Sequence, residues 1–186
     1  MSRMQNLDAD FICRKCGKTV LISQYALSRF CPICGTLLRP LRYWVFQFNS
    51  ATYKWYDWIK EGRDKEQWLV SKHAKSIQKG DRVVIWASGE KAGIYAIGEI
   101  VENPCIKPLN KDQEKYWTGK DDAIKFEDKP SVVIKYLKLF SDNPLLEEAC
   151  RKDRVLKAMQ ILKNPQGTNF ILTREQWKRI LKLLGQ

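Results

Sequence analysis

The alternation of apolar and polar positions predicts β-strands in three parts of the chain. Along "YWVFQFN" at residues 43–49, apolar side chains occupy both faces of an extended segment, which we expect to end at Asn49 and Ser50. Residues 82–101 read as a hairpin, "RVVIWAS" followed by "GIYAIGEIVE", and residues 131–140 supply another strand. Because both faces of these strands are apolar, the sheet is expected to be buried on both sides.

Helical spacing of apolar positions predicts helices outside these strands. Ser71 is expected to cap a short helix, and Thr173 with Gln176 forms the capping box of a C-terminal helix. Residues 110–130 are too charged to be core and predict a long polar loop. Apart from the short helix after Ser71, the segments expected to be helical are residues 52–62, 154–162 and 173–184.

Two glycines inside the apolar strands indicate that the sheet curves. Gly93 and Gly98 stand at positions where a strand can bend or bulge because no side chain is in the way. A sheet that is buried on both faces and strongly curved forms a small closed or half-closed barrel. With the helices, this predicts an α+β fold for the main part of the chain.

Two C-x-x-C-G units, "CRKCG" and "CPICG", mark the first forty residues. Two thiolates at this spacing can hold one metal ion from a tight turn, and the glycine supplies the backbone angles that such a turn needs. Four cysteine ligands suit a tetrahedral, structural zinc ion, since no position stays open for a reactant. A pair of disulfides or a redox C-x-x-C is the alternative. We therefore expect a small zinc ribbon with one Zn²⁺ held by Cys13, Cys16, Cys31 and Cys34.

The chain is basic, with 33 Lys and Arg residues against 21 Asp and Glu residues and a net charge of +12. Such a charge favours a polyanionic partner such as nucleic acid, although a basic surface that only keeps the protein soluble is the simpler alternative. No apolar run is long enough to span a membrane, and the N-terminal residues lack the apolar segment of a signal peptide. We expect a cytoplasmic protein with reduced cysteines and no membrane partner.

Residues 43–186 resemble an EVE domain, a member of the PUA-like superfamily of small β-barrels with flanking helices. Three segments carry the resemblance in the same order, "YWVFQFN", "WLVSKHAKSIQKGDRVVIWASGEKAGIYAIGEIVENP" and "NPQGTNFILTREQW". The zinc ribbon with its linker, residues 1–42, lies outside the resemblance and is expected to be a separate addition.

This resemblance implies recognition of a modified, flipped nucleobase, usually methylated or hydroxymethylated cytosine, in an aromatic pocket on the barrel. Trp86 would form one wall of the pocket, and Trp68 and Trp117 are candidates for the second aromatic face. Each residue also has an ordinary alternative as a core or turn residue. Lysines nearby would bind phosphates, namely Lys72, Lys75 and Lys79. The residues expected in the pocket are Asn49, Ser50, Trp68, Trp86, Ser88, Gly89, Trp117, Gly167, Thr168 and Asn169.

The sequence contains few residues that could form a catalytic site. Its single histidine, His73, stands at the beginning of the expected lysine-rich helix, where an exposed surface residue is the simpler account, and the acidic "EDK" at residues 127–129 falls in a polar loop. We therefore expect a non-catalytic reader of nucleic acid, with DNA favoured over RNA, and a separate effector protein for any reaction. Two alternatives stay open: an RNA-binding PUA-like protein, and an adaptor whose zinc ribbon docks a protein partner.

Overall fold

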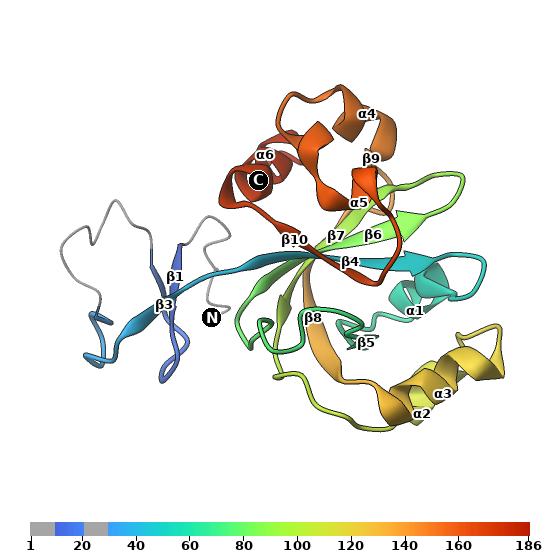
Figure 1. Cartoon of the computed structure of the whole chain (residues 1–186), viewed down its shortest axis with the longest axis horizontal. Helices are drawn as coiled ribbons and strands as arrows, with labels where there is room; N and C mark the ends of the chain where they lie inside the picture. Colours follow the sequence, from blue (N-terminus) through green and yellow to red (C-terminus); the bar gives the residue numbers. More distant parts are fainter. Residues whose placement is uncertain (1–9, 21–29) are drawn as a thin grey trace.

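The structure, a computed structural model, describes residues 10–20 and 30–186 and contains two β-sheets (Figure 1). The N-terminal sheet has three antiparallel strands in the order β2-β1-β3, and the main sheet has the order β10-β4-β6-β7-β8-β5 with β9 beside β7. The expected α+β class and the strands at 43–49, 82–101 and 131–140 are confirmed. The strands are β1 (Phe11–Cys13), β2 (Thr19–Val20), β3 (Leu38–Pro40), β4 (Tyr43–Asn49), β5 (Lys65–Leu69), β6 (Arg82–Ser88), β7 (Gly93–Ile100), β8 (Ser131–Leu139), β9 (Leu145–Leu146) and β10 (Asn169–Leu172).

Short helices flank the main sheet, and three expectations about them were wrong. The stretch expected to be a polar loop contains two helices, and the helix expected over residues 154–162 is interrupted at Met159, whose ψ of 140° is extended. Ser71 caps no helix, because only turns follow it and its hydroxyl accepts from the backbone N–H of Thr168 instead. The helices are α1 (Trp55–Lys60), α2 (Lys111–Glu114), α3 (Lys120–Asp128), α4 (Glu147–Lys152), the 3₁₀ turn η2 (Leu156–Ala158), α5 (Gln160–Lys163) and α6 (Arg174–Leu183).

The main sheet separates two hydrophobic cores, and β4 contributes to both. Tyr43 and Val45 pack in an outer core against the C-terminal helices α4 to α6, which cover one side of the sheet in Figure 1. Trp44, Phe46 and Phe48 point the other way, into an inner core that the curled sheet surrounds. The predicted alternation of β4 therefore corresponds to two buried faces.

The sheet curls into a half-barrel, and Gly98 is one of the positions where it bends. The pairing of β7 with β8 shifts register between Ile97 and Gly98. A Cβ atom on Gly98 would lie 2.7 Å from Cγ2 of Ile134 and 2.9 Å from the carbonyl oxygen of Lys135. A side chain at this position would force the two strands apart, which explains the glycine.

Asn169 links the two edge strands of the half-barrel, β5 and β10. Its side-chain oxygen accepts a hydrogen bond of 2.8 Å from the backbone N–H of Ser71, and its amide nitrogen donates to the carbonyl of Leu69 at 3.2 Å. The hydroxyls of Thr168 and Ser71 lie 2.7 Å apart in the same seam. Asn169 is buried, so these side-chain bonds satisfy backbone groups that have no neighbouring strand.

A buried carboxylate, Asp81, is one of the contacts through which the N-terminal sheet packs against the main part of the chain. Asp81 is fully buried and accepts hydrogen bonds from Nη1 of Arg39 at 2.6 Å, from the indole nitrogen of Trp44 at 2.9 Å and from the amide of Gln78 at 3.0 Å. Three donors compensate for the cost of burying this charge.

We call the described residues 10–20 and 30–40 the cysteine module; residues 1–9 and 21–29 of the expected zinc ribbon lie outside the described residues.

None of the described helices is both long and apolar enough to cross a membrane.

Candidate functional site

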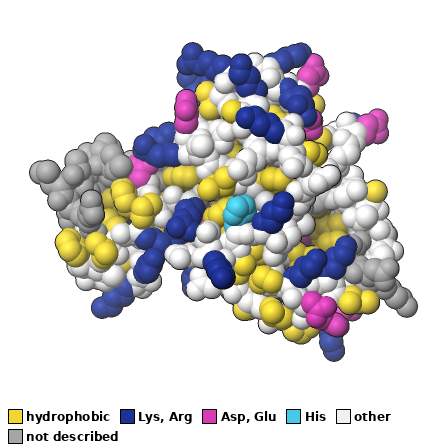
Figure 2. Space-filling model, viewed as in Figure 1, with side chains coloured by type: hydrophobic (Ala, Val, Ile, Leu, Met, Phe, Trp, Pro, Cys, Tyr) yellow, Lys and Arg dark blue, Asp and Glu magenta, His cyan; other side chains and the backbone are white. Residues whose placement is uncertain are grey.

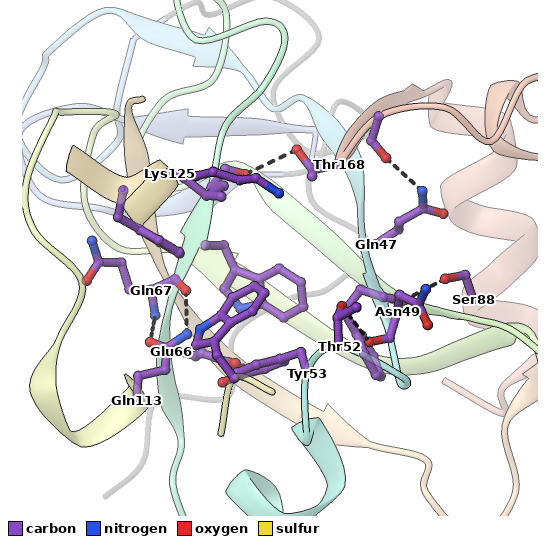
Figure 3. A pocket seen from close by; sticks show the side chains of 16 residues that line it. Gln47, Asn49, Thr52, Tyr53, Glu66, Gln67, Ser88, Gln113, Lys125 and Thr168 are labelled. Carbon is purple, nitrogen blue, oxygen red and sulfur yellow. Dashed lines mark hydrogen bonds between the residues drawn. The ribbon is translucent and has the colours of Figure 1, made fainter. Parts of the chain in front are cut away.

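A cavity of about 300 Å³ opens where β4, β5 and β6 end, and α2 and α3 cover its other side (Figure 3). We call it the barrel pocket. The segment between β4 and α1 and the turn before β10 complete its rim. Its lining residues are Gln47, Phe48, Asn49, Thr52, Tyr53, Glu66, Gln67, Trp68, Leu69, Ser88, Gln113, Trp117, Lys125, Phe126, Gly167 and Thr168.

Aromatic rings form much of the wall of the barrel pocket. The rings of Tyr53 and Trp117 lie 4.5 Å apart, and Phe126 meets Trp117 edge-on at 6.0 Å. On the inner side, Phe48 and Trp68 are 6.2 Å apart. Rings held against one another in this way lose little conformational freedom when a flat ligand stacks on them, so the pocket suits a planar aromatic molecule.

Several polar atoms of the pocket have no hydrogen-bond partner among the described residues. They are Oε1 of Gln47, the hydroxyl of Tyr53, both carboxylate oxygens of Glu66 and the indole nitrogen of Trp117. Buried polar atoms are normally paired, and leaving one unpaired costs about 1–3 kcal/mol. By contrast, the side chain of Gln113 is paired, because its oxygen accepts from the backbone N–H of Gln67 and its nitrogen donates to the carbonyl of Gln67. A polar ligand in the pocket could form hydrogen bonds with the unpaired atoms and remove this cost.

Glu66 is the most unusual of these groups. In β5 it points to the same face as Trp68, two positions later, which turns its carboxyl group into the half-barrel. Only 2% of its surface is exposed, and burial raises its pKa to about 8. The hydroxyl of Tyr53 lies close enough to lower this pKa in part, and the carboxyl in turn raises the pKa of Tyr53, which burial raises most. The pocket therefore holds an acid that stays largely protonated at neutral pH.

Basic residues lie at the pocket rim and in a second cleft. A Cβ atom on Gly167 would lie 3.8 Å from Nζ of Lys72, so this ammonium group stands at the pocket mouth. Lys75 and Lys79 instead line a cleft of about 670 Å³ between the main sheet and the cysteine module, together with Arg14 and Lys15. In Figure 2, Lys and Arg side chains lie on both sides of this boundary. Of the three predicted lysines, Lys72 thus lies at the mouth of the barrel pocket, whereas Lys75 and Lys79 lie in the neighbouring cleft.

The four cysteines of the C-x-x-C-G units form one cluster. Their sulfur atoms all lie within 4.8 Å of one another, with 3.5 Å between Cys13 and Cys34 and between Cys16 and Cys31. Such separations are too long for disulfide bonds and close to the edge of a tetrahedron of thiolates around one metal ion. The hydroxyl and amide of Thr36 lower the pKa of Cys34 to about 6, which favours the thiolate. The cluster can hold a metal ion.

Comparison with known proteins identifies the main part of the chain. The EVE domain family model matches residues 42–183. The chain belongs to the EVE domain family. A search of curated proteins finds no match.

Solved structures share this EVE fold at low sequence identity. Rpa0253 from Rhodopseudomonas palustris is 21% identical, with 78% of this chain and 94% of that chain covered and a TM-score of 0.59. A protein from Leishmania major is 18% identical, with 77% and 94% covered and a TM-score of 0.57. Human THYN1, solved in complex with DNA containing 5-methylcytosine, is 14% identical, with 78% and 98% covered and a TM-score of 0.57. The expected PUA-like fold is confirmed, as a half-barrel.

Of the ten residues expected in the base pocket of the EVE domain, the structure brings six together. These six line the barrel pocket and are Asn49, Trp68, Ser88, Trp117, Gly167 and Thr168.

The other four expected residues lie outside the lining of the barrel pocket. Trp86 is 2% exposed and packs in the outer core, because its side chain points away from the inner face to which Ile85 and Ala87 contribute. Ser50 and Gly89 are exposed and face each other beyond the rim, with 3.6 Å between Oγ of Ser50 and a Cβ atom built on Gly89. Asn169 is buried in the seam that joins β5 to β10.

Residue-level reasoning missed most of the polar groups in the pocket. Seven polar residues line it and were not expected there: Gln47, Thr52, Tyr53, Glu66, Gln67, Gln113 and Lys125. For Glu66 a signal was present, since alternation along "KEQWL" places Glu66 and Trp68 on one face of a strand. Nothing in the sequence indicated that α3 would bring Lys125 and Phe126 to the same place.

Proposed function

We propose that this protein is a non-catalytic reader that binds one modified, flipped nucleobase in the barrel pocket. One observation carries the proposal: unpaired polar atoms and aromatic rings converge on a single cavity. A flat base would stack on the rings while its edge pairs with the polar atoms. Stacking is worth about 1–3 kcal/mol per base, which offsets part of the cost of taking the base out of a duplex.

Methylated or hydroxymethylated cytosine in DNA is the ligand that we favour. The fold shared with human THYN1, solved with DNA containing 5-methylcytosine, supports this choice. A methyl group adds only about 0.8 kcal/mol of apolar contact. The shape of the pocket and the ease of flipping would therefore contribute much of the discrimination. RNA is the alternative polymer, and sensitivity to the 2′-hydroxyl would identify it.

We propose that basic residues hold the phosphates on either side of the base. Lys72 stands at the pocket mouth, and Lys75 and Lys79 line the cleft shared with the cysteine module. The net charge of +12 supports a polyanionic partner. Arg14 and Lys15, which lie between the first two cysteines, would extend this contact to the module.

We propose that the cysteine module is a zinc ribbon with one structural Zn²⁺ ion. Cys13, Cys16, Cys31 and Cys34 would hold it, and their four sulfur atoms fill a tetrahedral set. The ion would stabilise the module and supply no reaction chemistry. In this proposal a separate effector protein acts on what the reader binds.

Fluorescence polarisation of labelled oligonucleotides tests the reader. We expect DNA with one 5-methylcytosine or 5-hydroxymethylcytosine to bind more tightly than the same DNA with unmodified cytosine, and both to bind more tightly than DNA with an abasic site at the same position. Trp117→Ala, which removes a pocket wall, should reduce this preference at least tenfold. Trp86→Phe is the matched control, because Trp86 lies in the outer core. If both variants are folded and both keep the preference, the barrel pocket is not the base site.

An apolar surface on the cysteine module favours a second candidate, a protein adaptor. Phe30, Ile33 and Leu37 are each more than half exposed. Exposed apolar side chains grouped in this way are typical of protein contacts. If no oligonucleotide binds at low salt, the adaptor becomes the better proposal.

A further inference from the structure

Glu66 lies in the wall of the barrel pocket, in surroundings that are unusual for an acid with only a structural role. It is buried, lines the cavity, and neither of its carboxylate oxygens has a hydrogen-bond partner among the described residues. Apart from Lys125 it is also the only charged side chain among the described residues that line the pocket. The hydroxyl of Tyr53 and the indoles of Trp68 and Trp55 approach Glu66 closely enough to lower its pKa in part, but none of them makes a well-formed hydrogen bond to its carboxyl group. A buried acid with incomplete hydrogen bonding costs stability, and a bound ligand would complete the bonding.

We propose that Glu66 reads the edge of the flipped base as an uncharged carboxylic acid, which makes base recognition depend on a proton. This inference rests on the proposed reader function and deepens it. It assigns the edge contact to one residue and states the protonation form that makes the contact.

The chemistry follows from matching donors and acceptors. A protonated carboxyl group offers one O–H donor and one C=O acceptor side by side. The pairing edge of cytosine offers the ring nitrogen N3 as acceptor next to the N4 amino group as donor. The neutral acid can therefore make two hydrogen bonds with cytosine at once. An ionised Glu66 would keep only the bond from the amino group and would place its second oxygen against the lone pair of N3.

The surroundings of Glu66 favour the neutral form. Burial raises its pKa to about 8, and the indoles of Trp68 and Trp55 and the hydroxyl of Tyr53 counteract this only in part. Among titratable groups, the hydroxyl of Tyr53, before α1, acts on Glu66 directly. Tyr136 on β8 accepts from the two indoles through its hydroxyl, and Lys125 on α3 lines the same pocket. Lys125 is exposed at the rim, where solvent weakens its effect on the buried acid.

Binding at several pH values with two substitutions provides the test. The probes are one DNA strand with a single 5-methylcytosine and the same strand with an abasic site. The ratio of their affinities isolates the base contact from the backbone. If only protonated Glu66 binds the base, a pKa of about 8 predicts that this ratio falls about tenfold between about pH 6 and about pH 9.

The substitution Glu66→Gln is the decisive variant. Glutamine has the same shape and offers a donor and an acceptor at every pH, so it imitates the protonated acid. We expect it to keep most of the affinity ratio and to remove the dependence on pH. Glu66→Leu, which fills the space without hydrogen bonds, should lose the ratio at every pH.

The outcomes separate this inference from the proposed function. Loss of the ratio in folded Glu66→Gln at about pH 6, or a wild-type ratio that does not change with pH, overturns the role of neutral Glu66 alone. A wild-type ratio near one at every pH, for 5-methylcytosine and 5-hydroxymethylcytosine alike, overturns the reader function and this inference with it.

Thermal unfolding gives a readout that needs no ligand. Folded Glu66 keeps its proton up to a pKa of about 8, whereas the unfolded chain releases it near the ordinary value of 4.5. Folding therefore takes up a proton between these values, and the contribution of Glu66 to stability is lost as the pH rises through this window. The melting temperature of Glu66→Gln relative to wild type should rise from about pH 5 to about pH 8. An unchanged difference would show that Glu66 is ionised in the fold.

Discussion

Asn169 illustrates how one side chain can determine the shape of a pocket. The amide replaces a strand neighbour by bonding to the backbone of Ser71 and Leu69, and this holds the turn with Gly167 and Thr168 against the end of β5. Those two residues line the barrel pocket. Asn169 therefore shapes the pocket while lying outside its lining, which makes it a positioning residue.

Replacing Asn169 with alanine should weaken both the fold and the base contact. The change removes the 2.8 Å bond from the N–H of Ser71 and the 3.2 Å bond to the C=O of Leu69, and leaves these partly buried groups only the longer contacts with the hydroxyl of Thr168 at 3.3 Å and 3.5 Å; an uncompensated loss costs about 1–3 kcal/mol each. We expect the free energy of unfolding in urea to fall by about 2–4 kcal/mol. Asn143→Ala, at an exposed position after β8, is the control and should change stability by less than about 0.5 kcal/mol. Equal effects of the two substitutions would show that the seam does not hold the half-barrel closed.

At the scale of elements, the cysteine module shows how little apolar packing supports it. Its described core consists of Cys13, Val20, Cys31 and Leu38, two of which are members of the sulfur cluster. Gly17 and Gly35 both have φ near 70° and donate to the carbonyls of Cys13 and Cys31 at 2.9 Å, so the two turns have the same construction. A sheet of this size needs a further source of stability, and a bound metal ion supplies it in the proposed zinc ribbon.

Metal analysis of the purified chain tests the zinc ribbon. We expect one zinc ion per chain by plasma mass spectrometry, and Cys34→Ser should reduce this content strongly because the tetrahedral set loses a ligand. Cys105→Ser is the matched control, since this exposed cysteine lies outside the cluster and should leave the zinc content unchanged. A chelator should make the cysteine module sensitive to protease. Zinc-free protein with an intact, protease-resistant module would exclude the structural ion.

The sequence predicts a strand or a helix end correctly where one local rule is sufficient to specify it. Both faces of β4 and the capping box of α6 followed from alternation and from the Thr173 to Gln176 spacing. Prediction from the sequence failed where a functional residue or a contact between distant segments outweighs the local pattern of apolar and polar positions. Strand β5 was missed because its inward positions include Glu66, a polar residue that the pocket uses. Helix α3 was missed because Ile124 is exposed while Phe126 is buried, so its apolar residues show no clear period.

At the scale of the whole molecule, the cysteine module is fixed in place beside the half-barrel. The buried pair of Arg39 and Asp81 joins them, and Arg39 also donates to the carbonyl of Lys79. Gly80, with a φ of 89°, packs so closely on Ile12 that a Cβ atom would come within 2.3 Å of its Cδ1. Because these contacts orient the module, the cleft with Lys75 and Lys79 has a defined shape. A nucleic-acid strand leaving the pocket would meet a prepared basic surface.

The salt dependence of DNA binding tests whether this cleft holds phosphates. Each phosphate contact contributes about 0.9 to the slope of log affinity against log salt concentration, or about 0.7 on a single strand. The double substitution Lys75→Gln with Lys79→Gln should therefore reduce the slope by about 1.4–1.8 and leave the preference for a modified base unchanged, since neither lysine lines the barrel pocket.

A second pair of substitutions separates phosphate contacts in the cleft from a general effect of charge. Lys157→Gln with Lys163→Gln changes the net charge equally, but these exposed lysines lie on η2 and α5, outside the lining of the cleft. The slope should stay close to that of the wild type, because it counts neutralised phosphates and responds little to distant charge. If both pairs lower the slope by the same amount, the basic surface acts only through its net charge, and the cleft is no phosphate channel. If only the cleft pair lowers it, Lys75 and Lys79 hold phosphates in the cleft beside the cysteine module.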